Sequence, residues 1–322
     1  MASPSETSIV IVAGPTASGK SALGLHLAER FDGTIINADS QQVYRDLAVL
    51  SARPGAAELA RAPHRLYGVI DAAEACSAGR WRHLALEAIA EAHRERRLPI
   101  LVGGTGLYLE ALLRGLAELP PIPAAARTEA QALRESLGQA GFHAALAALD
   151  PESAQRLAPA DKQRVTRAYE VARATGVPMS EWRRRQQAPN AGLRAAAIVL
   201  LPPRDVLYRA CDARVLAMIE AGAEAEVETL MRRGLAPNLP AMKAVGVREL
   251  GAFLSGQVSH AQAVAAMQQA TRNYAKRQYT WFGRRLPISN SLKKLPVETQ
   301  FSESLLPEIF SFIREFLLTR TL

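Results

Sequence analysis

The sequence predicts an α/β protein: a doubly wound parallel sheet with a phosphate-binding loop (P-loop) forms the core, and an all-helical domain is inserted into it. The apolar run Ser8–Ala13, a glycine-rich turn and a helical pattern over Ala22–Arg30 open the chain. Further apolar runs alternate with helical patterns, an order that is typical of parallel sheets covered by helices on both faces. Between about residues 124 and 187 only helical periodicity is present, which indicates the insertion.

The turn after the first strand has the spacing GxxxxGKS that defines a P-loop. It consists of Gly14, Pro15, Thr16, Ala17, Ser18, Gly19, Lys20 and Ser21. Backbone N–H groups at the start of the following helix attract a di- or triphosphate. Lys20 would place its charge at the terminal phosphate, and the Ser21 hydroxyl would be the protein ligand of a Mg²⁺ ion. The alternative is a chance glycine turn with a solvated lysine.

Two further polar positions follow predicted strands. Asp39 comes after the strand Thr34–Ala38, and Thr105 follows the strand Leu98–Val102. Because ligands of such sheets bind at the carboxyl ends of the strands, we expect the P-loop, Asp39 and Thr105 to face one crevice. An alternative role for Asp39 is the N-cap of a helix that begins near Ser40.

The other predicted elements continue this pattern. They are a strand over Arg65–Ile70, a helix over Ala78–Arg97, insertion helices over Arg127–Leu137, Phe142–Leu149 and Asp161–Thr175, a strand over Arg194–Leu201, and helices over Arg204–Ala221, Ala223–Arg233, Ala241–Leu250, about Ser259–Arg285 and Phe301–Leu318. We expect the last helix to cover the core. The proline run 119–123 is the near hinge of the insertion. The predicted domains are therefore residues 1–120 with 192–322, the catalytic core, and residues 121–191, the helical insertion.

The composition is that of a soluble globular protein, with 48% hydrophobic and 22% charged residues among 322. No apolar run reaches the ~20 residues of a membrane span, and the N-terminus lacks the charged region of a signal peptide. Two cysteines, Cys76 and Cys211, fit a reducing cytoplasm better than a disulfide framework. We expect a cytoplasmic protein and, since nothing requires an oligomer, a monomer. The net charge of +8 suits a polyanionic partner.

Two basic segments are candidates for a nucleic-acid surface. From Asp161 to Arg194, eight Lys and Arg residues stand against three acidic ones. Residues 271–285 include no acid and mix cations with aromatic rings, a combination suited to phosphates and stacked bases. The alternative for both segments is a solvated helix face, with aromatic rings turned inward and cations outward.

Together these stretches resemble the tRNA dimethylallyltransferases, also called tRNA isopentenyltransferases. The motifs that carry the resemblance are GPTASGKS (Gly14–Ser21), INADSQQVYR (Ile36–Arg45), APHRL (Ala62–Leu66), LVGGTGLYL (Leu101–Leu109), DKQRVTRAYEV (Asp161–Val171), GVPMSEW (Gly176–Trp182), AMKAVGVREL (Ala241–Leu250) and ATRNYAKRQYTWF (Ala270–Phe282). The resemblance implies transfer of a dimethylallyl group from dimethylallyl diphosphate, with Mg²⁺, to N6 of the adenosine immediately 3′ of the tRNA anticodon (position 37).

The resemblance also implies roles for individual residues. The catalytic residues would be Lys20, Asp39, Thr105 and Arg214. The P-loop, Lys20 and Arg214 would hold the departing diphosphate, and Asp39 would accept the proton that N6 loses. The expected contacts to the tRNA anticodon stem-loop are Asp39, Ser40, Gln41, Gln42, Thr105, Arg127, Gln163, Arg164, Val165, Thr166, Arg167, Lys243, Gly246, Arg248, Arg272, Lys276 and Arg277. An adenine stacked in a loop must be flipped out to reach such a site.

Three other functions are compatible with parts of this pattern. An adenylate isopentenyltransferase would prenylate free AMP, ADP or ATP with the same P-loop and Asp39. A small-molecule kinase would share the P-loop and the sheet but would bind ATP and an acceptor hydroxyl. A tRNA-binding module with a vestigial loop would need neither Lys20 nor Asp39, both of which are intact.

Overall fold

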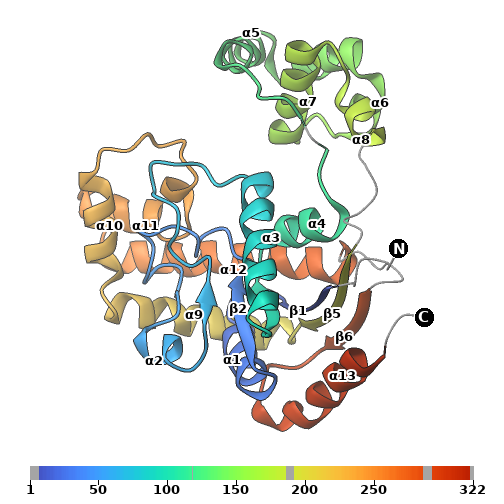
Figure 1. Ribbon diagram of the computed structural model, residues 1–322. Helices are drawn as coiled ribbons and strands as arrows, with labels where there is room; N and C mark the ends of the chain where they lie inside the picture. The colour runs from blue at the N-terminus through green and yellow to red at the C-terminus, as the bar shows by residue number, and fades with distance from the viewer. Residues whose placement is uncertain (1–6, 118, 186–191, 286–291, 320–322) are drawn as a thin grey trace, which may run out of the picture. The chain divides into compact units, whose positions relative to one another are not determined.

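The computed structural model describes residues 7–117, 119–185, 192–285 and 292–319. Its sheet has six strands in the order β3-β2-β4-β1-β5-β6, and every neighbouring pair is parallel (Figure 1). The strands are β1 Thr7–Ala13, β2 Gly33–Asn37, β3 His64–Arg65, β4 Leu98–Gly103, β5 Leu193–Leu200 and β6 Leu292–Val297. The predicted α/β class with a P-loop in a parallel sheet is confirmed.

Helices cover both faces of this sheet. Ile9 and Ile11 of β1 belong to a core cluster on one face, whereas Val10 and Val12 belong to the cluster on the other face, as the two-residue period of a strand requires. The second cluster is closed by α1 Lys20–Arg30 and α13 Leu306–Leu318. The first contains residues of α3 Ala78–Arg94, α4 Gly106–Arg114, α9 Arg204–Glu220, α10 Ala223–Arg232, α11 Val247–Leu254 and α12 His260–Arg285. Within the described residues, no helix is both long enough and apolar enough to cross a membrane.

The last helix covers the core as expected. Ile309, Ile313 and Phe316 of α13 are buried at helical spacing in the second cluster. This helix begins later than predicted, after a short turn of 3₁₀ helix at Glu303–Leu305, and it has a proline in its first turn. A proline is tolerated there because the first N–H groups of a helix have no partner within it.

The structure differs from the predicted elements at several places, and the helices α2 Ala56–Leu59, α4, α6 Pro151–Arg156 and α8 Met179–Arg184 were not predicted. The strand expected over Arg65–Ile70 is limited to β3, because Leu66 and Gly68 adopt left-handed φ angles of 67° and 61° that turn the chain out of the sheet. The edge strand β6 was not predicted. The helix expected over Ala241–Leu250 is divided into a 3₁₀ turn, Ala241–Lys243, and α11, since Gly246 has a φ of 99°.

Contacts divide the chain into two compact units, one within Met1–Arg114 and Asn190–Leu322 and the other within Gly115–Pro189. The second unit consists of α5 Ala124–Leu149, α6 Pro151–Arg156, α7 Lys162–Thr175 and α8 Met179–Arg184. Gly138, with a φ of 65°, interrupts α5, and this is where two separate helices were predicted. The buried Asp150 carboxylate caps α6 and accepts hydrogen bonds from both the N–H and the hydroxyl of Ser180 at the start of α8.

Candidate active site

The P-loop runs from the end of β1 to the first turn of α1, which begins at Lys20. Gly14 and Gly19 have φ angles of 147° and 91°, which L side chains rarely adopt. A Cβ at Gly14 would lie 2.4 Å from the carbonyl oxygen of Leu200, and a Cβ at Gly19 would lie 2.7 Å from Cβ of Phe301. Both glycines are therefore required by the curvature of the loop and by its close neighbours.

Lys20 is half-buried beside the loop, and its Nζ donates a hydrogen bond to the carbonyl oxygen of Pro15. Burial lowers the pKa of Lys20 to about 7; Arg214 acts in the same direction, whereas Asp39 opposes the shift. An anion bound next to Lys20 would favour its charged form. The Ser18 hydroxyl of the same loop is 0% exposed and has no hydrogen-bond partner among the described residues.

Asp39 follows β2 in a turn that polar groups hold in place. The Asn37 side chain donates to the carbonyl oxygen of Asp39 at 3.0 Å and accepts from its N–H at 2.9 Å. Oδ1 of Asp39 accepts a hydrogen bond of 2.9 Å from the N–H of Gln41. Residues 40–43, all of them described, form turns and no helix, so the alternative that Asp39 caps a helix beginning near Ser40 is wrong.

Thr105 lies just after β4 and contacts the turn that follows Asp39. The N–H of Ser40 donates to Oγ1 of Thr105 at 2.8 Å, and this hydroxyl donates to Oγ of Ser40 at 3.1 Å. The phenol of Tyr274, on α12, lies near both side chains and lines the cavity described below. Burial and the nearby Asp39 raise the pKa of Tyr274, so the phenol is neutral. Tyr274 was not among the predicted site residues.

A cavity of about 140 Å³ lies at the carboxyl edge of the sheet. Thr105, Ser40 and the P-loop residues Gly14, Pro15 and Ser18 are not among the residues that line it. The predicted site residues that line it are Thr16, Ala17, Gly19, Lys20, Ser21, Asp39, Gln41, Gln42 and Arg214. Nη2 of Arg214 lies 3.4 Å from the carbonyl oxygen of Ser51, which also accepts from Gln42 at 2.9 Å. Burial lowers the pKa of Arg214, and Asp39 opposes this. The cavity therefore combines two half-buried cations with a carboxylate, an arrangement that can hold an anion beside a proton acceptor.

A carboxylate of α10 holds the segment that closes one side of this cavity. Oε2 of Glu226 accepts hydrogen bonds from the N–H groups of Ala48 and Val49 at 2.7 and 2.8 Å, and Oε1 accepts from the N–H of Leu50 at 2.9 Å. Leu50 and the next residue, Ser51, line the cavity. Glu226 was not predicted, because the residues that it contacts lie more than 170 positions away in the sequence.

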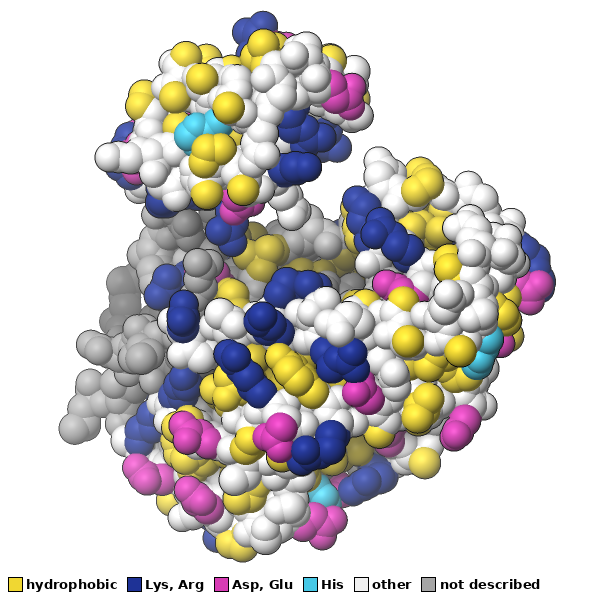
Figure 2. Space-filling view, turned by 180° about the vertical axis from the view of Figure 1, so that it is seen from behind, with side chains coloured by type: hydrophobic (Ala, Val, Ile, Leu, Met, Phe, Trp, Pro, Cys, Tyr) yellow, Lys and Arg dark blue, Asp and Glu magenta, His cyan; other side chains and the backbone are white. Residues whose placement is uncertain are grey.

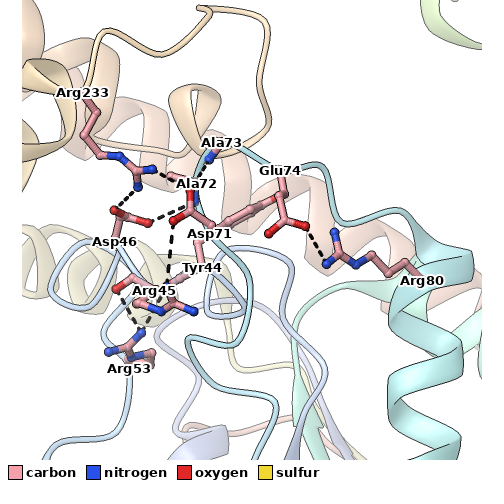
Figure 3. A network of polar contacts seen from close by, with 10 residues as sticks. All are labelled: Tyr44, Arg45, Asp46, Arg53, Asp71, Ala72, Ala73, Glu74, Arg80 and Arg233. Atoms are coloured by element: carbon pink, nitrogen blue, oxygen red, sulfur yellow. Dashed lines mark hydrogen bonds and ion pairs between the residues drawn. The ribbon is translucent and has the colours of Figure 1, made fainter.

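A network of ion pairs fastens the same segment at its outer side (Figure 3). Arg233 bridges Asp46 and Asp71, and Asp46 also accepts a hydrogen bond of 3.0 Å from the N–H of Ala72. The backbones of Tyr44 and Ile70 form a parallel β-bridge, and the two aspartates lie close to these residues in the sequence. The network therefore secures the chain that leads from Asp39 to the cavity wall.

Gln278 of α12 connects the P-loop to β4. Its Oε1 accepts a hydrogen bond of 2.8 Å from the N–H of Thr16, and its Nε2 donates one of 2.9 Å to the carbonyl oxygen of Gly104. This side chain is buried, and it too was not predicted as a site residue.

Besides Ser40 and Thr105, six of the predicted tRNA contacts lie in the sheet unit without lining the cavity. Lys243, Arg248, Lys276 and Arg277 are exposed, whereas Arg272 is paired with Asp212. Gly246 is buried, and a Cβ there would come within 2.5 Å of Leu50, so its role is to let the backbone approach the cavity wall. Figure 2 shows Lys and Arg side chains gathered in the middle of one face of the molecule, with several Asp and Glu side chains below them.

The helical unit holds the other predicted tRNA contacts. Arg127, Gln163 and Arg164 are exposed. The hydroxyl of Thr166 accepts a hydrogen bond from Arg134 at 3.2 Å, and Arg167 lies 3.5 Å from Glu170. Val165 is only 2% exposed because it packs into the core of this unit. Its side chain is therefore turned away from solvent, and the predicted contact of Val165 with tRNA stays a prediction.

Residues 42–285 match the family model of the IPP transferases. The tRNA dimethylallyltransferase of Rhodospirillum rubrum is 52% identical to this chain over 320 residues, which are 99% of this chain and 98% of the relative. The chain belongs to the tRNA dimethylallyltransferase family. The family member from Rhodospirillum centenum is 57% identical over 280 residues, 87% of this chain and 89% of its own length. The predicted family is thus confirmed.

Solved structures of the tRNA dimethylallyltransferase family have the same fold. The tRNA isopentenylpyrophosphate transferase of Bacillus halodurans is 32% identical, with a TM-score of 0.67 and coverage of 97% of each chain. A eukaryotic dimethylallyltransferase, described as acting on tRNA, is 26% identical, with a TM-score of 0.79 over 96% of this chain and 80% of its own.

Proposed function

We propose that this protein transfers a dimethylallyl group from dimethylallyl diphosphate to N6 of the adenosine immediately 3′ of the anticodon in tRNA, releasing diphosphate. The observation that carries the proposal is the cavity in which Lys20, Arg214 and Asp39 meet beside the P-loop. One chain supplies all of these residues, so the proposal takes the monomer as the active species.

The first task of the site is to hold the leaving group. The bond that breaks joins C1 of the prenyl group to the bridging oxygen, and the electron pair of this bond remains with the diphosphate. Preorganised donors aimed at the place where charge develops supply the largest part of the stabilisation in such reactions. The diphosphate oxygens would be bound by the P-loop N–H groups and by Lys20 and Arg214, which are both half-buried at the cavity.

The residues at the cavity fit a Mg²⁺ ion that is held together with the substrate. Among the described residues, no group of three or more His, Cys, Asp or Glu side chains could hold a metal ion by itself. Mg²⁺ is typically bound by few protein oxygens, several waters and the phosphates of a substrate. The Ser21 hydroxyl, which lines the cavity, would be the protein ligand. When bound, the ion would neutralise part of the charge on the diphosphate.

The second task is to take up a proton. N6 of adenine is a weak nucleophile, and it must lose one of its protons as its bond to C1 of the prenyl group forms. Asp39 would accept this proton as the general base. Its own turn holds Oδ1 through the N–H of Gln41, which leaves Oδ2 for the substrate. Thr105, Ser40 and Tyr274 would then form the polar wall against which the adenine is oriented.

The acceptor is a tRNA and not a free nucleotide in this proposal. A mononucleotide would occupy the cavity alone, whereas Arg164 and Arg167 of the helical unit and Lys276 and Arg277 of α12 offer cations to a longer polyanion. The adenine would leave its stack to enter the cavity.

Mass spectrometry of digested tRNA tests the proposal. Bulk tRNA is incubated with the protein, dimethylallyl diphosphate and Mg²⁺, and AMP and ATP serve as competing acceptors in parallel reactions. We expect N6-dimethylallyladenosine in tRNA and little prenylated AMP or ATP. Equal transfer to AMP would overturn the tRNA assignment in favour of an adenylate isopentenyltransferase, and ATP turnover without prenyl transfer would favour a kinase.

A further inference from the structure

The outer side of the P-loop is held by the segment that connects β6 to α13. Nε2 of Gln300 donates a hydrogen bond of 3.0 Å to the carbonyl oxygen of Ala17, and the neighbouring Phe301 packs against Gly19. Neither Gln300 nor Phe301 is among the residues that line the cavity. Both therefore contact the loop from the side that the substrate does not occupy.

Ala17 has a backbone conformation that requires support. Its φ is 61°, in the left-handed region, which is unfavourable for a residue with a Cβ. Two side chains fix peptides of this stretch: Gln278 accepts from the N–H of Thr16, in the peptide between Pro15 and Thr16, and Gln300 donates to the carbonyl oxygen of Ala17, in the peptide between Ala17 and Ser18. The conformation of the loop thus depends on contacts that are distant in the sequence.

The contact with Gln300 has a direct consequence for anion binding. In a trans peptide, the carbonyl of one residue and the N–H of the next point in opposite directions. Since Gln300 holds the carbonyl of Ala17 outward, the N–H of Ser18 is directed to the opposite side of the loop. An N–H turned inward in this way is the donor that a phosphate requires.

We infer that Gln300 is a positioning residue for the diphosphate: it fixes the peptide between Ala17 and Ser18 in the orientation that presents the Ser18 N–H to the substrate. This inference rests on the proposed function, because it takes the P-loop to be the diphosphate site. The side chain is held in this orientation although its Oε1 is buried without a hydrogen-bond partner among the described residues. An unpaired buried acceptor costs free energy, so the stability of the fold alone does not favour a glutamine here.

The test compares two variants with matched controls. Gln300→Met keeps the length of the side chain and removes its donor, and Gln300→Asn keeps the amide but shortens its reach. Gln257→Met makes the same chemical change at an exposed position, and Phe316→Leu disturbs the core under α13 without touching the loop. Binding of inorganic pyrophosphate with Mg²⁺ is measured by calorimetry, steady-state kinetics by prenyl transfer to tRNA, and folding by thermal unfolding.

We expect both Gln300 variants to bind pyrophosphate about 5-fold more weakly, as the loss of one neutral hydrogen bond implies. KM for dimethylallyl diphosphate should rise by a similar factor, whereas KM for tRNA should stay unchanged. Gln257→Met should leave all of these values unchanged, and Phe316→Leu should lower only the unfolding temperature. Wild-type affinity for pyrophosphate in both folded Gln300 variants would overturn the inference.

The same measurements separate this inference from the proposed function. Lys20→Ala is included because it must weaken pyrophosphate binding if the P-loop is the diphosphate site. Absence of pyrophosphate binding by the wild-type protein, or normal binding by Lys20→Ala, would contradict the proposed function itself. Weak binding by Lys20→Ala together with normal binding by the Gln300 variants would contradict only the role of Gln300.

Discussion

The N–H of Ser40 donates a hydrogen bond of 2.8 Å to Oγ1 of Thr105. This bond joins the turn after β2 to the end of β4, so two strands that are neighbours in the sheet hold the Asp39 turn between them. Thr105 therefore helps to fix the position of Asp39.

Replacing Thr105 by valine should slow prenyl transfer about 10-fold or more. Valine keeps the shape of the side chain but leaves the N–H of Ser40 without its acceptor, and an unpaired buried donor costs about 1–3 kcal/mol. Single-turnover kinetics at saturating substrates measure the change. Thr105→Ser, which keeps the hydroxyl, is the control and should remain within a factor of about 3 of the wild type; an equal loss in both variants would speak against the hydrogen bond.

Asp39→Asn should reduce turnover by about 10²- to 10⁴-fold. The amide oxygen can still accept from the N–H of Gln41, as Oδ1 does now, so the turn is preserved while the proton acceptor is lost. Binding of tRNA, measured by filter retention, should change little. A variant with normal turnover, or one whose defect is explained by its lower unfolding temperature, would contradict the role of Asp39 as general base.

Lys20 should make the stability of the fold depend on pH. Burial lowers its pKa from 10.5 to about 7, so between these values the unfolded chain binds a proton that the folded chain does not. Stability rises with pH wherever the unfolded state binds more protons. Lys20 therefore lowers the free energy of unfolding most strongly below about pH 7. This destabilising effect decreases as the pH rises toward 10.5.

The variant Lys20→Met removes this titration. It should exceed the wild type in free energy of unfolding at about pH 6, and the difference should shrink toward about pH 10. Urea unfolding across this range measures it. Prenyl transfer should fall about 10²-fold or more, because a charge directed at the leaving group is lost. A difference in stability that does not vary with pH would indicate that the folded lysine is charged throughout.

Glu226→Gln should loosen the cavity wall from a distance. The carboxylate accepts three backbone hydrogen bonds from Ala48, Val49 and Leu50, and an amide offers only one oxygen in its place. We expect the free energy of unfolding to fall by about 1–3 kcal/mol and KM for dimethylallyl diphosphate to rise. Glu228→Gln, on the same helix but paired only with the exposed Arg232, should change neither quantity.

The part of the site that follows from local sequence could be predicted. The P-loop, Asp39 and Arg214 were expected to share one site from motif spacing, strand ends and family resemblance, and five residues of the loop line the cavity together with Asp39 and Arg214. The side chains that were missed act through contacts far along the chain. Glu226, Gln278 and Gln300 each bind the backbone of a segment more than 170 residues away, and no periodicity or spacing indicates such a partner.

One strand and the position of one side chain were also not predicted, for reasons that lie in the local sequence. The sequence of β6, LKKLPV, carries two lysines and a proline, features of an edge strand that do not produce the apolar run of a buried strand. In the helical unit, Val165 was grouped with its basic neighbours because they adjoin it in the sequence. On α7 its side chain points instead into the core, as the helical period requires.

The final prediction concerns the charge of the helical unit. Arg164 lies 3.5 Å from Asp161, the N-cap of α7, and Arg167 lies 3.5 Å from Glu170 of the same helix. Ion pairs that solvent reaches are weak, so a phosphate can replace the carboxylate. Each phosphate that a cation neutralises releases counterions, and the logarithm of the affinity then falls linearly with the logarithm of the salt concentration.

The double variant Arg164→Ala, Arg167→Ala should reduce this slope for tRNA by roughly one unit per lost contact and leave the affinity for pyrophosphate unchanged. Arg173→Ala, which removes a cation of the same helix that is paired with Glu129, provides the matched control and should leave the slope near its wild-type value. The affinity for tRNA is measured at several salt concentrations between about 50 and 200 mM; a slope that is the same in the double variant and the wild type would mean that these two arginines are only solvated.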